Sequence, residues 1–190
     1  AAAAVFVISR GRARGELVKG TGHQTVFYAI LGAALVARVA VAMTVRGYGV
    51  DMGCFEGWSH RLAGLGPSAF YDPAVFCDYP PGYLWVLMFL GRARAAFGVG
   101  LDTAAGWLFI KSVPIAVDLI CAALLYAYAR RRLGEVAALT LGGFFAFNPA
   151  VFLGTAAWGQ IDSVLALLLA IAVLEAVKGR WIVAVPVYAV

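Results

Sequence analysis

Long apolar runs that end in arginine or lysine constrain this chain more than any other feature. The clearest run, about 108–129, ends directly in Arg130, Arg131 and Arg132. A helix of about 20 apolar residues is long enough to cross the hydrocarbon core of a bilayer. Over the whole chain, 63% of the residues are hydrophobic and only 13% are charged. That leaves too little polar surface for an ordinary soluble domain, so we predict an all-α integral membrane protein.

The other apolar runs extend this prediction to a polytopic helix bundle. We expect one transmembrane domain over residues 1–190, a fragment of a longer protein, with about four complete spans and a partial fifth. The complete spans are expected at about 25–45, 108–129, 136–155 and 161–177, and the partial span at 181–190. Basic residues cluster at 10–19, 130–132 and 178–180, which the positive-inside rule assigns to the cytoplasmic side. The net charge of +5 therefore indicates topology, and no nucleic-acid partner is expected.

The same topology places a long outer loop, 46–107, on the extracytoplasmic side. Residues 55–65 are predicted to form an interfacial helix with Phe55, Trp58, Leu62 and Leu65 on its apolar face and with Glu56 solvated. Residues 82–90 are too short to cross and are rich in Tyr and Trp, which predicts a second interfacial helix. Cys54 and Cys77 fall in this loop, where a disulfide between them is one alternative and free thiols are the other.

Polar clusters at the outer ends of these runs carry a family resemblance. Asp51 opens the outer loop, Asp78-Tyr79-Pro80-Pro81 follows it, and Trp158-Gly159-Gln160-Ile161-Asp162 forms the tip of a predicted helical hairpin. This order, over about 26–177, resembles the GT-C glycosyltransferases, which are multi-spanning enzymes that use lipid-phosphate sugars. The resemblance implies transfer of a hexose such as mannose or glucose from a polyprenyl-phosphate donor to a glycan, lipid or protein acceptor, at the extracytoplasmic face of the membrane.

The resemblance assigns the role of catalytic base to Asp51. An acceptor hydroxyl is a poor nucleophile until a positioned carboxylate takes its proton, so one carboxylate suffices for direct displacement with inversion. A lipid phosphate leaves without an acid, unlike the leaving group in hydrolases that use paired carboxylates. The alternative for Asp51 is a loop or cap residue just beyond a helix, and it stays open at this point.

Other residues in these clusters are candidates for substrate and phosphate contacts. The substrate-binding candidates are Glu56, Asp78, Tyr79, Trp158, Gln160 and Asp162, because indole rings stack on sugars and amide or carboxylate groups bind hydroxyls. Arg38 and Lys111 are candidates for the donor phosphate, with buried polar contacts between helices as their alternative role. Asp51, Glu56 and His60 match no metal-ligand spacing, so no metal site is assigned and the need for a divalent cation stays open.

Two other classes of function remain open. A transporter or flippase for a lipid-linked or anionic substrate would also keep Arg38, Lys111 and Asp118 inside the membrane. It would be expected to place broken helices near the midplane, whereas the richest polar clusters here lie at the outer ends. A non-catalytic membrane subunit is the third class, and it would tolerate loss of Asp51.

Overall fold

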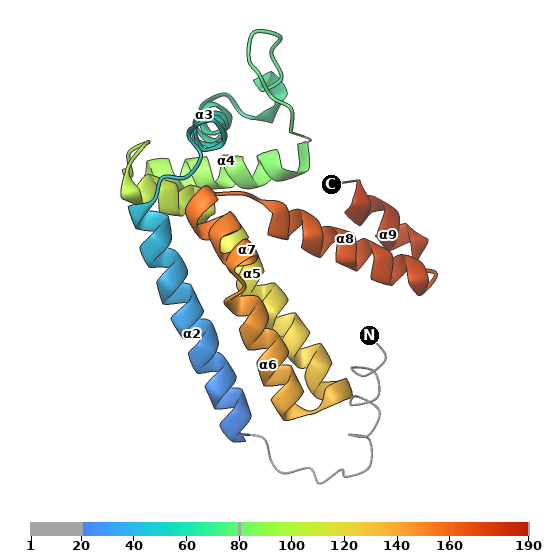
Figure 1. The fold of residues 1–190 in the computed structure, drawn as a ribbon. Coiled ribbons are helices and arrows are strands. Elements are labelled where there is room, and N and C mark those ends of the chain that lie inside the picture. The colour runs from blue at the N-terminus through green and yellow to red at the C-terminus, as the bar shows by residue number, and fades with distance from the viewer. Residues whose placement is uncertain (1–20, 80, 190) are drawn as a thin grey trace.

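The structure is a computed structural model that describes residues 21–79 and 81–189. Its regular elements are helices throughout this range, so the predicted all-α class is confirmed. The elements are α2 (Thr21–Thr44), α3 (Gly49–Leu65), η2 (Pro67–Ala69), α4 (Pro81–Ala96), α5 (Ala104–Leu133), α6 (Glu135–Ala146), α7 (Pro149–Phe152), η3 (Leu153–Trp158), α8 (Asp162–Val177) and α9 (Trp181–Tyr188). Figure 1 shows a bundle with two helices, α3 and α4, lying across its end and with α8 and α9 projecting to one side.

The bundle is built from α2, α5 and α6, which lie side by side (Figure 1). Helix α2 has 24 residues and α5 has 30, and both are long and apolar enough to cross a membrane. At 1.5 Å per residue they reach about 36 and 45 Å, beyond the ~30 Å of a hydrocarbon core. Ala34, Ala122 and Ala146 are fully buried between the three helices. Such small side chains let helix backbones approach closely, as membrane helices commonly do.

The third predicted span, 136–155, is broken. Helix α6 ends at Ala146, and the segment of α7 and η3 continues after a bend of 40°. Asn148 caps α7 by accepting a 3.0 Å hydrogen bond from the amide of Ala150, and Pro149 occupies the first helical position. Because a residue before proline avoids the helical conformation, Asn148 and Pro149 end one helix and start the next.

The prediction of about four complete spans is not confirmed. The described residues hold two helices that could cross a membrane, or three if the bent pair counts as one span. Helix α8, the predicted fourth span, has 16 residues, about 24 Å, and leaves the bundle sideways to pack against α9 (Figure 1). The predicted bounds, 161–177, agree with α8 to within one residue, but the apolar composition did not determine the direction of the helix. The basic cluster at 10–19 lies outside the described residues.

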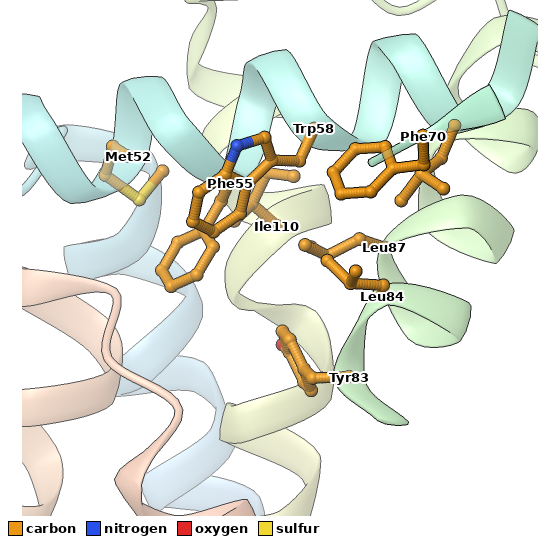
Figure 2. Packing of buried hydrophobic residues seen from close by; sticks show 9 residues of the cluster. Met52, Phe55, Trp58, Phe70, Tyr83, Leu84, Leu87 and Ile110 are labelled. Atoms are coloured by element: carbon orange, nitrogen blue, oxygen red, sulfur yellow. The ribbon is translucent and has the colours of Figure 1, made fainter. Parts of the chain in front are cut away.

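Helices α3 and α4 cross the end of the bundle, where α5 begins (Figure 1). Between them and α5 lies the largest apolar cluster, which includes Met52, Phe55, Trp58, Leu87 and Ile110 (Figure 2). Gly91 permits the close crossing of α3 and α4, since a Cβ there would clash with the carbonyl of Ser59. The segment 46–107 therefore has its own packed core.

Two predictions about this segment are wrong. Phe55, Trp58 and Leu62, predicted to face the membrane interface, are buried against α4 and α5, whereas Leu65 is exposed. Glu56, predicted to be solvated, is only 6% exposed. The amphipathic pattern identified the buried face correctly, but not that protein rather than lipid covers it. The cysteines of the segment, Cys54 and Cys77, are both free thiols in the structure.

Candidate active site

The carboxylate of Asp51 is bound by the hairpin tip. Asp51 lies in the first turn of α3, and its Oδ2 accepts hydrogen bonds from the indole Nε1 of Trp158, at 3.1 Å, and from the side-chain amide of Gln160. Within the described residues its other oxygen, Oδ1, accepts none. These partners stand more than a hundred positions away in the sequence, so the fold brings together two of the polar clusters that the sequence analysis singled out.

This contact forms at one end of the bundle. The end of α2, the start of α5 and the tip after η3 all lie there, while α5 finishes in Arg130, Arg131 and Arg132 at the other end (Figure 1). The predicted topology puts Asp51 and the hairpin tip on the side opposite the arginine triplet. The structure places Asp51, Trp158 and Gln160 in that arrangement.

Two glycines make the close approach of these segments possible. Gly47 joins α2 to α3 with a φ of 99°, and a Cβ there would collide with the carbonyl of Trp158. Gly159 has a φ of 92°, and a Cβ there would lie 2.6 Å from the sulfur of Met52. Both positions are left-handed and crowded, so a side chain would strain the backbone and push the tip away from Asp51.

Lys111 fastens the tip to the rest of the bundle. Its Nζ donates to the carbonyls of Val45, Ala156 and Ala157 at 2.6, 3.0 and 3.2 Å, and the side chain is fully buried. Ala156 and Ala157 belong to η3, a π-helical turn, a geometry that often accompanies functional sites. An ammonium has three donors, and all three are used. The donor-phosphate role of Lys111 stays a prediction, since binding would require it to release a carbonyl.

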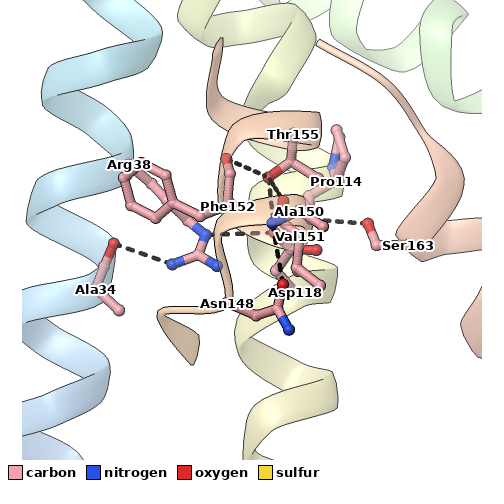
Figure 3. Close-up of polar contacts among 10 residues, drawn as sticks. All are labelled: Ala34, Arg38, Pro114, Asp118, Asn148, Ala150, Val151, Phe152, Thr155 and Ser163. Atoms are coloured by element: carbon pink, nitrogen blue, oxygen red, sulfur yellow. Dashed lines mark hydrogen bonds and ion pairs between the residues drawn. The ribbon is translucent and has the colours of Figure 1, made fainter. Parts of the chain in front are cut away.

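A second polar cluster lies deeper in the bundle (Figure 3). Asp118 Oδ2 accepts a 2.6 Å hydrogen bond from Thr155 and pairs at 3.3 Å with Nε of Arg38. Arg38 also donates to the carbonyl of Ala34 and lies 4.9 Å from the ring centroid of Phe152. Asp118 and Arg38 are fully buried. Arg38 therefore holds α2 against α5, and its donor-phosphate role stays a prediction.

Tyr79 lies among the acidic side chains of the site. Burial, and then the carboxylates of Asp51, Asp78 and Asp162, raise the pKa of its phenol above the ordinary value. Its ring packs edge-on against Phe55, with the centroids 5.4 Å apart. Tyr79 thus keeps its proton, and its phenol lies within electrostatic range of three of the predicted site residues. Its neighbour Pro80 lies outside the described residues.

Glu56 holds two chain segments together. Its carboxylate lies 3.4 Å from Nη2 of Arg46 and accepts a 3.0 Å hydrogen bond from the amide of Asp102, whose own carboxylate pairs with Arg46 at 2.7 Å. These contacts tie the α2–α3 connection to the loop before α5. Over the described ranges, no three His, Cys, Asp or Glu side chains group as metal ligands would.

A groove and a cavity lie next to the hairpin tip. An open groove of about 650 Å³ runs between the α2–α3 connection and the α7–η3 segment, and its mostly apolar lining includes Tyr48, Leu153 and Trp158. A cavity of about 280 Å³ lies between α5, η3 and α8 and is lined by Asp118, Gln160 and Asp162 among others. Trp158 and Gln160, the two residues that bind Asp51, therefore each border one of these hollows.

The residues of the two polar clusters differ in whether the sequence could have indicated their roles. Asp118 and Arg38 carried a usable signal, because charged residues in apolar helices pair with one another. Thr155, Gly47 and Gly159 carried none, since their roles depend on which segments meet.

Comparison of the chain with protein-family models, with curated proteins and with solved structures finds no match.

Proposed function

We propose that the protein is a membrane glycosyltransferase of the GT-C type. It transfers a hexose from a polyprenyl-phosphate donor to an acceptor hydroxyl, with inversion, at the extracytoplasmic face. Asp51 is the general base. The observation that carries the proposal is the contact of Asp51 with Trp158 and Gln160, which joins an acidic residue to an indole and an amide suited to a sugar.

The environment of Asp51 favours a proton acceptor. Both hydrogen-bond partners are neutral side chains, so they orient the carboxylate without cancelling its charge. Asp51 is partly buried, and its Oδ1 is left for an incoming hydroxyl. A base needs hydrogen-bond reach to the proton that it takes, and it acts best when fixed in place beforehand.

The apolar groove beside Trp158 supports a lipid-linked donor. Its wall of Leu153, Ala157 and Pro149 offers an isoprenoid chain a surface like that of lipid, and Trp158 stands at the junction of the groove with Asp51. A donor whose chain lies in the groove would bring its sugar to the carboxylate. Lys111 and Arg38 remain the proposed cations for the phosphate.

The test is transfer of radiolabelled mannose or glucose from the polyprenyl-phosphate sugar in membranes that contain the full-length protein. We expect Asp51→Asn to lower transfer about 10²- to 10⁴-fold, the usual contribution of a general base. Asp72→Asn is the matched control, because Asp72 is an exposed carboxylate of the same outer segment that pairs with Arg61. Transfer retained by Asp51→Asn would overturn the assignment of the base.

A second candidate function is transport or flipping of a lipid-linked substrate. The broken third segment favours it, because the bend between α6 and α7 lies next to the buried charges Arg38 and Asp118 (Figure 3). Substrate movement across proteoliposomes without any transfer by the wild-type protein would favour this function over the enzyme. A non-catalytic subunit would show neither activity.

A further inference from the structure

The exposed face of helix α4 is aromatic. Trp85 is 55% exposed and Phe89 is 70% exposed. Arg92 and Ala96, which are also exposed, follow at a spacing of three or four residues, so the four side chains share one face of the helix. The opposite face, which includes Leu87, packs against α3 and α5. Contiguous exposed apolar surface of this kind marks a site of contact with a protein or with a membrane.

The direction of α4 favours the membrane. Helices α2 and α5 are long and apolar enough to cross a bilayer, and α4 lies across the end of the bundle that they build (Figure 1). A helix that crosses the end of membrane-spanning helices runs parallel to the bilayer surface, near the level of the lipid headgroups. Figure 1 also shows α3 farther from the bundle than α4. Of the two helices, α4 is therefore the one that lies nearer to the lipid.

The aromatic surface continues from α4 onto α5. Phe97 directly follows α4 and is 76% exposed, and its ring lies 6.2 Å, between centroids, from that of Phe109. Phe109 is partly exposed near the start of α5, one of the two long apolar helices. A surface that would face lipid at the outer end of α5 thus extends along α4. Aromatic side chains are enriched at this level of membrane proteins.

The charge on this face matches lipid phosphates. Helix α4 contains no acidic residue, and the side chain of Arg92 has no hydrogen bond or ion pair within the described residues. The stem of an arginine can lie along apolar surface while its guanidinium reaches a phosphate. A symmetric contact between two copies of this face would instead bury the cation against an apolar, basic surface, which is costly without an anionic partner.

We propose that Trp85, Phe89 and Phe97 insert into the outer leaflet of the bilayer and that Arg92 binds lipid phosphates there. The inference assigns lipid-facing residues to the interfacial helix that the sequence predicts at 82–90, and it extends the surface to the corner beyond that helix. It requires no transfer of sugar, so it goes beyond the proposed function and does not rest on it.

This surface would also set the depth of the candidate active site. Gly91 lets α4 cross α3 closely at Ser59, so the two helices move as one unit. Asp51 lies in the first turn of α3. Insertion of the aromatic face of α4 would therefore hold Asp51 close to the headgroup level of the outer leaflet.

Fluorescence quenching by spin-labelled lipids tests the inference. A cysteine-free form of the full-length protein would carry Phe89→Cys, labelled with an NBD fluorophore, in nanodiscs of phosphatidylcholine. Phe76→Cys is the matched control, because Phe76 is 69% exposed and belongs to the loop between η2 and α4, which rises away from the bundle (Figure 1). We expect phospholipid spin-labelled on its acyl chain to quench the label at position 89 several-fold more than the label at position 76.

Two further positions sharpen the test. The label on Phe97→Cys should also be quenched by the acyl-chain probe, and this variant keeps the inference testable if Phe89→Cys fails to fold. The label on Arg92→Cys should be quenched more by phospholipid spin-labelled on its headgroup than by the acyl-chain probe. A label at position 92 that neither lipid probe quenches would overturn the phosphate contact.

Aqueous iodide identifies what covers the face if lipid does not. Quenching at positions 89 and 97 by iodide, with no more quenching by the lipid probes than at position 76, would overturn the inference and place the face in water. Protection of both labels from iodide and from the lipid probes would overturn it in favour of a protein contact, either with a second copy or with another segment of the full-length protein.

Discussion

Two aspartates bind the same short π-helical region, but they differ in burial and in the charge of their partners. Asp118 is fully buried, paired with Arg38 and bonded to Thr155 of η3. Asp51 is partly buried and bonded to Trp158 and Gln160, which carry no charge. The first carboxylate is paired with a cation in the core, and the second has only neutral hydrogen-bond partners at the end of the bundle.

The contrast separates a carboxylate that holds the bundle from one available for proton transfer. Removing one partner of a buried ion pair leaves an uncompensated charge in a medium that solvates it poorly. Removing a partly exposed carboxylate with neutral partners leaves nothing comparable behind. Asp118 should therefore matter most for stability, and Asp51 for the rate of transfer.

The largest expected effect is on folding. Asp118→Ala should lower the free energy of unfolding by about 3–5 kcal/mol, because Arg38 is left buried and unpaired. Asp51→Ala should cost about 1 kcal/mol or less. Thermal or denaturant unfolding of the reconstituted variants measures both. Replacing the pair together, as Arg38→Met with Asp118→Leu, should recover most of the loss, and equal losses for Asp51→Ala and Asp118→Ala would break the contrast.

A smaller effect is expected where the tip passes Asp51. Gly159→Ala should cost on the order of 1–3 kcal/mol, because it forces an alanine into a left-handed backbone against the sulfur of Met52. Gly154→Ala is the matched control, since it lies in the same π-helix at an ordinary φ with open space around its missing Cβ. The free energy of unfolding should fall for Gly159→Ala only. Similar behaviour of the two variants would contradict the close approach.

The smallest effect concerns the electrostatics near Asp51. Burial, and then the carboxylates of Asp78 and Asp51, raise the pKa of the Cys54 thiol above its ordinary value. The thiolate is the reactive form, so alkylation of Cys54 should be slow at pH 8 and should accelerate as the pH rises through that raised pKa. Asp78→Asn should lower the pKa and speed alkylation at pH 8 by a factor of about two. An unchanged rate would show that the carboxylate of Asp78 does not raise the pKa of the Cys54 thiol.

Sequence alone predicted the parts of this molecule that depend on local pattern. The apolar runs at 25–45 and 108–129 became α2 and α5, and the polar clusters at Asp51 and at Trp158 to Asp162 came together at one end. The residue types in those clusters were informative because polar side chains between apolar runs are costly without a role.

The rest depended on contacts that no local pattern encodes. Lys111 binds backbone carbonyls, which every residue has, so its partners at Val45, Ala156 and Ala157 left no trace in the sequence. Glu56 was assigned to a solvated face because it lies on the polar side of the predicted amphipathic helix, but Arg46 and the loop at Asp102 cover it. Helix α8 matched the composition of a span, while its direction depends on packing against α9.

The central claim is that Gln160 orients Asp51 for proton transfer, and a double-mutant cycle on kcat tests it most directly. Transfer would be measured for wild type, Asp51→Asn, Gln160→Ala and the double variant. We predict that Gln160→Ala lowers kcat about tenfold in the wild-type background, by loss of a hydrogen bond to a charged group, and has no further effect once Asp51 is Asn. An equal loss in both backgrounds would contradict the account, because Gln160 would then act independently of Asp51.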